Sequence, residues 1–144
     1  MKPRISEIDL HRSVADFLNL MLLPPAVWTT FPAGWTPMRS GAAGRLKGCG
    51  LRAGMPDILV FHNGFTVGLE LKAANGTLSR PQQDMFAKLR NAGVLVHICR
   101  SIEDVYKALS VCHHIPMRKF NAPRIATPEG RRTKESTQGA SSAA

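Results

Sequence analysis

Apolar residues recur at intervals of three and four near the start of the chain, at Leu10, Val14, Phe17, Leu18 and Met21. This spacing places them on one face of an α-helix, so we expect an amphipathic helix from Glu7 to about Met21. Ser6 precedes it as a helix cap, with Asp9 three residues later. Glu7 extends the apolar stripe and should therefore lean towards the protein, although an acidic residue in a first turn often serves only the helix dipole.

The pattern changes to that of two short strands between Gly54 and Lys72. Residues 57–62 form a mostly apolar run, residues 65–72 form a second one, and Asn63-Gly64 stands between them. This pair is a strong signal for a two-residue turn, because both residues tolerate positive φ. Counting outwards from the turn pairs Asp57 with Glu70. Lys72 lies two residues beyond Glu70 and points to the same face, so the register gathers two carboxylates and one ammonium group.

The remaining segments complete an α/β pattern. Residues 27–31 read as a strand, Ser79 to Gly93 as a capped helix, 94–99 as a strand, and the stretch from Ser101 as a helix carrying Val105, Leu109 and Cys112. The continuous apolar run over 94–99 is typical of a buried central strand. Residues 31–52 are rich in Pro and Gly and are longer than an ordinary connection, which is typical of a functional or mobile loop. We therefore expect a mixed sheet flanked by helices in residues 1–115, followed by a basic, disordered tail in residues 116–144.

Two carboxylates that face each other across a β-ladder repel, so a fold gains nothing from the pair Asp57 and Glu70. A divalent cation would remove the repulsion, and carboxylate oxygens are the ligands that Mg²⁺ and Mn²⁺ prefer. Lys72 is then placed to position or activate a water, or to neutralise charge in a transition state. The alternative is a solvated hairpin end at which Lys72 only balances Glu70.

The charge of the chain indicates a polyanionic partner, with nucleic acid the first candidate. The net charge is +9 and the pI about 10.2. No acidic residue occurs between Asp16 and Asp57, whereas four basic residues lie there: Arg39, Arg45, Lys47 and Arg52. A basic segment directly before the carboxylates would draw phosphates towards a metal ion. The alternative is a general contribution to solubility.

Other residues of catalytic or metal-binding type form no pattern. Three cysteines without regular spacing argue against a disulfide framework. Cys112-His113-His114 has no partner cluster at zinc spacing. His11, His62 and His97 are single residues without a serine or cysteine placed as a nucleophile partner. The chain has no signal-peptide core and no apolar run near the roughly 20 residues of a membrane span, so we expect a cytoplasmic protein.

Pro56-Asp57 followed by Glu70-Leu71-Lys72 resembles the motif of the PD-(D/E)xK nuclease superfamily. A longer ordered set resembles the VRR-NUC family in particular, and consists of residues 50–57, 70–72, 76–82, 92–96 and Arg100-Ser101. The resemblance covers about residues 5–112. It implies a restriction-endonuclease-like core with a mixed central β-sheet.

The resemblance also implies an activity, which is metal-dependent hydrolysis of DNA, with branched, flap or Holliday-junction DNA as substrate. Asp57, Glu70 and the Leu71 carbonyl are then the implied ligands of Mg²⁺ or Mn²⁺, and Glu7 and Gln82 are supporting site residues. Gln82 is equally well explained as a capping-box partner of Ser79. Analogy with junction-cutting members implies a homodimer and a phage or prophage origin. Two alternatives stay open: a non-catalytic nucleic-acid-binding module with this fold, and a nuclease for single-stranded DNA or RNA.

Overall fold

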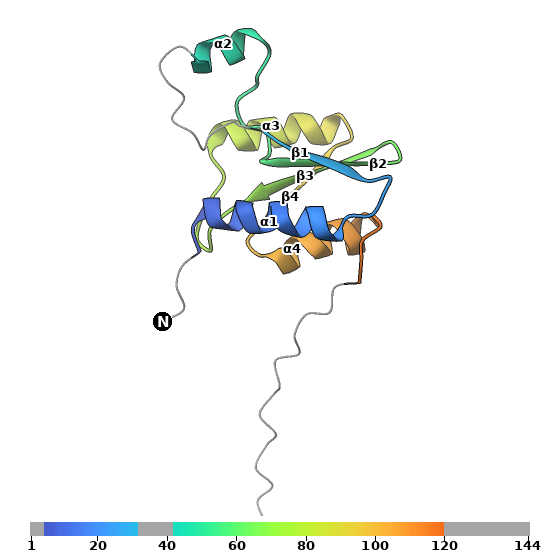
Figure 1. Cartoon of the computed structure of the whole chain (residues 1–144). Coiled ribbons are helices and arrows are strands. Elements are labelled where there is room, and N and C mark those ends of the chain that lie inside the picture. The colour runs from blue at the N-terminus through green and yellow to red at the C-terminus, as the bar shows by residue number, and fades with distance from the viewer. Residues whose placement is uncertain (1–4, 32–41, 120–144) are drawn as a thin grey trace, which may run out of the picture.

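The computed structural model describes residues 5–31 and 42–119 of the 144-residue chain (Figure 1). The elements follow in the order α1 (Glu7–Met21), β1 (Val27–Thr30), α2 (Ala42–Gly48), β2 (Ile58–His62), β3 (Phe65–Leu71), α3 (Arg80–Asn91), β4 (Leu95–Cys99), α4 (Ile102–Tyr106) and the π-helical segment η1 (Lys107–Cys112). Apart from α2 and the π-helical character of η1, these are the elements that the hydrophobic pattern predicts, in the predicted order.

The strands form one mixed sheet in the order β1-β2-β3-β4. β2 pairs antiparallel with β1 and β3, whereas β4 lies parallel to β3. The β2–β3 turn uses Asn63 and Gly64, whose φ angles of 45° and 81° are both positive, as a two-residue hairpin of this kind requires. His62 pairs with Phe65 and Ile58 with Leu69. The predicted hairpin register is therefore confirmed, and one step beyond the end of β2 it sets Asp57 opposite Glu70.

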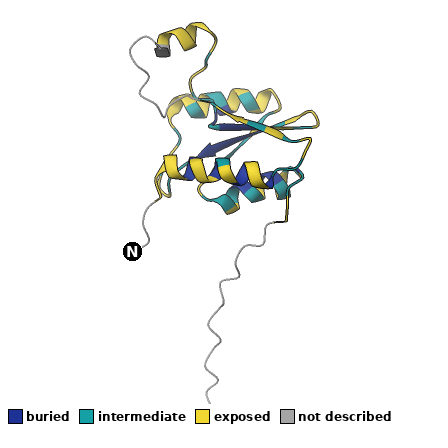
Figure 2. Ribbon diagram, viewed as in Figure 1, coloured by how far each residue is buried: buried dark blue, intermediate teal, exposed yellow. Residues whose placement is uncertain are grey.

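Helices cover both faces of the sheet. In Figure 1, α1 and α4 lie on one side and α3 on the other. The main core fills the first side, where Val60, Val67 and Leu69 belong to the same buried cluster as Val14 and Leu18 of α1; Figure 2 shows the buried strands between the helices. Because side chains alternate along a strand, Glu70 points away from this core, to the side covered by α3.

The prediction of a buried central strand over residues 94–99 is wrong. β4 stands at the end of the sheet in the described part of the chain, paired with β3 alone. Leu95 and Ile98 remain 46% and 43% exposed, while Cys99 is fully buried. An apolar run shows that a strand is partly buried, but its place in the sheet depends on which strands reach its two sides.

The connection over residues 31–52 contains a helix, α2, that the apolar pattern did not predict. In Figure 1, α2 extends away from the sheet on the side of α3. Its seven residues include two glycines and carry no apolar stripe, and residues 44–48 are all exposed. Residues 32–41, and Arg39 with them, lie outside the described residues.

The last helix starts at a Ser101 cap as expected, since the Ser101 hydroxyl accepts the Asp104 N–H. Its second half is π-helical, with more residues per turn, so Cys112 does not return to the buried stripe of Val105 and Leu109 and is exposed. No helix in residues 5–31 or 42–119 is long and apolar enough to cross a bilayer.

The chain after η1 returns to the end of α1. Leu22 and Met117 form an isolated antiparallel bridge, and the Arg118 N–H donates to the Met21 carbonyl at 2.8 Å. The domain boundary predicted at residue 115 falls just before this contact. The rest of the predicted tail, residues 120–144, lies outside the described residues.

Candidate active site

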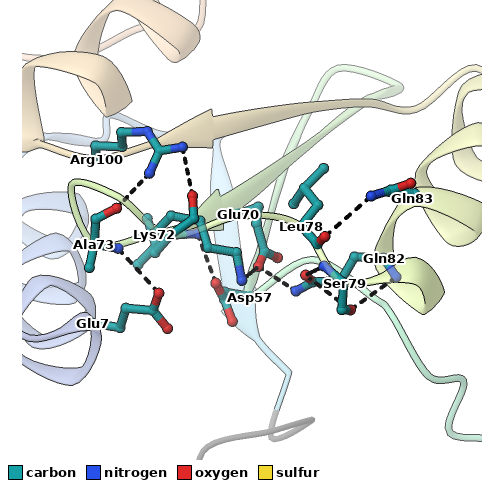
Figure 3. A network of polar contacts seen from close by, with 12 residues as sticks. Glu7, Asp57, Glu70, Lys72, Ala73, Leu78, Ser79, Gln82, Gln83 and Arg100 are labelled. Atoms are coloured by element: carbon teal, nitrogen blue, oxygen red, sulfur yellow. Dashed lines mark hydrogen bonds and ion pairs between the residues drawn. The ribbon is translucent and has the colours of Figure 1, made fainter.

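Asp57 and Glu70 face each other at one end of the sheet, close to the first turn of α3 (Figure 3). Asp57 directly precedes β2, and Glu70 is the last residue but one of β3. The Asp57 carboxylate accepts the Leu71 N–H at 2.8 Å through Oδ2, which ties it to the end of β3. Directly opposed residues have Cβ atoms roughly 5 Å apart, so the two carboxylates share one small space.

The two oxygens of Glu70 have different surroundings. Oε1 accepts hydrogen bonds from Lys72 Nζ at 2.9 Å and from Gln82 Nε2 at 2.5 Å. Oε2 is buried and has no hydrogen-bond partner among the described residues. A buried carboxylate oxygen without a partner is costly. It is therefore the atom that a cation lying between Glu70 and Asp57 would satisfy.

Burial raises the pKa of both carboxyl groups above their ordinary values. The Leu71 N–H opposes this effect on the pKa of Asp57, and the Lys72 hydrogen bond opposes it on the pKa of Glu70. The charge of Asp57 raises the pKa of Glu70 further. A divalent cation would reverse these effects, and Mg²⁺ commonly needs only one or two carboxylates besides waters and substrate phosphates. The residues present therefore fit Mg²⁺ or Mn²⁺.

Gln82 makes both of the contacts that the sequence offered as alternatives, one to the helix cap and one to the carboxylate site. Its Oε1 accepts the Ser79 N–H at 2.9 Å, and the Ser79 hydroxyl accepts the Gln82 N–H, which completes the capping box of α3. Its Nε2 donates to Glu70. The helix cap and the contact with the carboxylate use different atoms of one amide, so they do not compete.

Glu7 reaches the loop that follows Lys72, as Figure 3 shows, and its Oε1 accepts the Ala73 N–H at 3.2 Å. Arg100, whose role in the site was not predicted, donates to the Ala73 and Gly76 carbonyls at 2.5 and 2.9 Å. Together these contacts hold the loop beside the carboxylates. The described residues contain no group of three or more His, Cys, Asp or Glu side chains that could hold a metal ion. The supporting role of Glu7 in the site stays a prediction, although its charge contributes to the raised pKa of Asp57.

Comparison with known proteins identifies the architecture. No family model and no curated protein matches the chain. A solved structure described as a VRR_NUC domain protein matches it with a TM-score of 0.62, over 81% of this chain and 93% of that one, at 15% sequence identity. The chain has a VRR-NUC fold. The restriction-endonuclease-like architecture expected from the sequence is therefore confirmed, and at this identity the likeness establishes the fold and not the activity.

The three described residues that were predicted to bind nucleic acid, Arg45, Lys47 and Arg52, lie outside the group of carboxylates. Arg45 and Lys47 are exposed on α2, and Arg52 is exposed in the segment that leads to Asp57. Gly54 marks where this segment passes α3: its φ is +80°, and an added Cβ would lie 2.1 Å from the Pro81 carbonyl oxygen. The basic segment therefore runs past the start of α3 directly into the carboxylate site.

The sequence pattern gave His11 no function, because no nucleophile partner accompanies it. In this fold it is linked to Asp57 through Thr30. Its Nε2 is 3.1 Å from the Thr30 hydroxyl, which donates to the Asp57 carbonyl at 2.9 Å. The sequence did contain one indication that His11 lies near the site: it follows Glu7 by four residues and so shares its helix face. Its partner, Thr30, belongs to β1 and cannot be found from helical spacing.

Proposed function

We propose that this protein is a metal-dependent nuclease that hydrolyses phosphodiester bonds in DNA. The observation that carries the proposal is the buried, unpartnered Oε2 of Glu70, in a site where Asp57 is near enough for its charge to raise the pKa of Glu70. The stability of the fold gains nothing from this pair, whereas a divalent cation would supply the missing interaction. The VRR-NUC fold of the chain supports the same conclusion.

Asp57, Glu70 and the Leu71 carbonyl are the proposed ligands of Mg²⁺ or Mn²⁺. When bound, the ion polarises the scissile phosphate and lowers the pKa of a coordinated water. Gln82 and Lys72 both donate to Glu70 Oε1, so Glu70 is held from two sides. The Lys72 side chain is 12% exposed, so its ammonium group can donate to an attacking water or to a phosphate oxygen that gains charge.

DNA is the proposed substrate because the chain is strongly basic and its acid-free segment leads into the site. Arg45, Lys47 and Arg52 would contact phosphates along this path, and Arg39 is the fourth candidate. Following the family resemblance, we propose branched, flap or Holliday-junction DNA as the preferred form. Symmetrical cutting of a junction needs two active sites, so the proposal includes a homodimer.

The test is a cleavage panel of duplex, flap, four-way junction, single-stranded DNA and RNA, with Mg²⁺, Mn²⁺ or EDTA. We expect cutting of branched DNA that EDTA abolishes. Lys72→Ala should reduce the rate about 100-fold or more while DNA binding persists, because it removes a donor from the site and leaves α2 intact. Lys107→Ala, on η1 across the sheet from α3, is the matched control and should cut at the wild-type rate.

The panel also separates the alternatives. DNA binding without cleavage under any metal condition would indicate a non-catalytic binding module. Cleavage of RNA or single strands alone would change the substrate and keep the chemistry. If Lys72→Ala cuts branched DNA at the original rate, the role given to Lys72 is wrong.

A further inference from the structure

Three residues from three elements form a hydrogen-bonded chain behind the carboxylate site. His11 lies on α1, Thr30 ends β1, and Asp57 precedes β2. His11 Nε2 is 3.1 Å from Thr30 Oγ1, and Thr30 Oγ1 is 2.9 Å from the Asp57 carbonyl oxygen. His11 is only 8% exposed, so the fold buries a polar ring on the face of α1 that also carries Glu7.

The chemistry of the hydroxyl group sets the direction of this chain. Thr30 has one hydroxyl proton, and it donates that proton to the Asp57 carbonyl. The Thr30 oxygen can then only accept from His11, so Nε2 of His11 carries a proton. The Asp57 carbonyl also accepts the Phe31 N–H at 3.0 Å, which occupies both of its acceptor positions.

Asp57 is thus held from both ends of the residue. Its main chain is fixed from the side of α1 and β1, and its carboxylate is fixed by the Leu71 N–H at the end of β3. An aliphatic residue on this face of α1 would fill the core but could not donate to Thr30.

We propose that His11 is a positioning residue for the metal site: through the Thr30 hydroxyl it holds the Asp57 main chain so that the carboxylate stays opposite Glu70. The inference rests on the proposed nuclease function. Partners that orient metal ligands typically change metal affinity 10–100-fold when they are removed. His11 would act in this way through the backbone of the ligand and not through its carboxylate.

The first test measures Mn²⁺ binding to the full chain from the EPR signal of the free ion. His11→Leu and Thr30→Val, which break the chain of hydrogen bonds, should each weaken Mn²⁺ affinity about tenfold or more. His11→Gln keeps an N–H donor and Thr30→Ser keeps the hydroxyl, so both should stay within about threefold of wild type. Combining His11→Leu with Thr30→Val should weaken binding little further, because both changes interrupt one path.

The outcomes separate this inference from the proposed function. One outcome overturns the role of His11 and leaves the nuclease proposal standing. In that outcome the wild type binds Mn²⁺, Asp57→Asn abolishes the binding, and Thr30→Val binds Mn²⁺ as tightly as the wild type. If wild type neither binds Mn²⁺ nor cuts DNA, both fall. Thr30 is exposed and valine has nearly the same shape, so we expect Thr30→Val to fold. Its Mn²⁺ affinity therefore tests the hydrogen-bond chain even if His11→Leu fails to fold.

A second test needs no metal. Long-range ¹H–¹⁵N NMR spectra of the wild-type chain at a pH where the imidazole is neutral report which nitrogen carries the proton. We expect the proton of His11 on Nε2. A proton on Nδ1 would contradict the direction of the hydrogen bonds and overturn the inference.

Discussion

Gln82 on α3 donates a hydrogen bond of 2.5 Å to Glu70 on β3, while its side-chain oxygen accepts the N–H of its own helix cap, Ser79, at 2.9 Å. The start of the helix and the orientation of the carboxylate therefore depend on one amide. Glutamate, the other common residue at this capping position, has the acceptor that the helix needs but no donor for Glu70.

This difference predicts the behaviour of Gln82→Glu. The variant keeps the cap and places a second carboxylate against Glu70. We expect the metal-free protein to lose about 1 kcal/mol or more of its free energy of unfolding at pH 7.5, because a hydrogen bond to a buried charge becomes a repulsion. The loss should be smaller near pH 5, where protonation relieves the repulsion. Urea unfolding at both pH values measures it.

Ser79→Ala is the control for Gln82→Glu, since it removes a cap hydroxyl without adding charge. It should cost about 0.5–2 kcal/mol at either pH. Equal losses at pH 5 and pH 7.5 for Gln82→Glu would show that its charge does not act on Glu70.

The raised pKa of Glu70 predicts how stability depends on pH. Since burial raises this pKa, the folded protein holds the proton more tightly than the unfolded chain does. The resulting loss of stability is absent below the ordinary value of 4.5, grows as pH rises through the raised pKa, and is complete above it. Glu70→Gln, which mimics the protonated form, should therefore unfold at higher urea concentration than wild type at pH 8 without divalent ions. The difference should disappear towards pH 4.

Added Mn²⁺ extends this experiment. It should stabilise wild type against urea and leave Glu70→Gln nearly unchanged, because the variant lacks a proposed ligand. Glu103→Gln, at an exposed glutamate of α4, serves as the matched control and should follow wild type at every pH. A Glu70→Gln variant that is less stable than wild type at pH 8 would contradict the assigned cause of the pKa shift.

Gly54→Ala should destabilise the protein by about 2 kcal/mol or more. The residue has a positive φ, and the new methyl group would collide with the Pro81 carbonyl oxygen. Cleavage should fall as well, because residues 55 and 56 connect this position directly to Asp57. Thermal unfolding and the cleavage rate provide the two measurements. Gly44→Ala on α2, where an added Cβ meets nothing within 4 Å, should leave both close to wild type.

Replacing Arg45 and Lys47 together by glutamine should flatten the salt dependence of DNA affinity. Each lost phosphate contact lowers the slope of log K against log salt by about 0.9 for duplex DNA. Filter binding or fluorescence anisotropy between low and physiological salt measures this slope. Lys107→Gln, which also replaces a basic residue by glutamine but lies outside α2, is the control. An unchanged slope in the double variant would exclude α2 from the DNA path.

Much of the site could be predicted because it depends on local geometry. A two-residue turn at Asn63-Gly64 fixes which residues of the two strands pair, and this register pairs Asp57 with Glu70. Because side chains alternate between the two faces of a strand, Lys72 lies on the same face as Glu70. The caps at Ser6, Ser79 and Ser101 follow in the same way, since a cap and its partner lie within three residues. The resemblance to VRR-NUC proteins rests on the same short strings.

The sequence by itself thus determined the order of the elements other than α2, the hairpin register and the pair of opposed carboxylates. Only the tertiary structure decided that β4 forms an edge, that Gln82 serves helix and carboxylate together, and that His11 supports Asp57 through Thr30. The physical reason is the range of the interactions. Turns and caps act within a few residues, whereas the bond from Ala73 to Glu7 joins positions 66 residues apart and forms only once α1 has packed on the sheet.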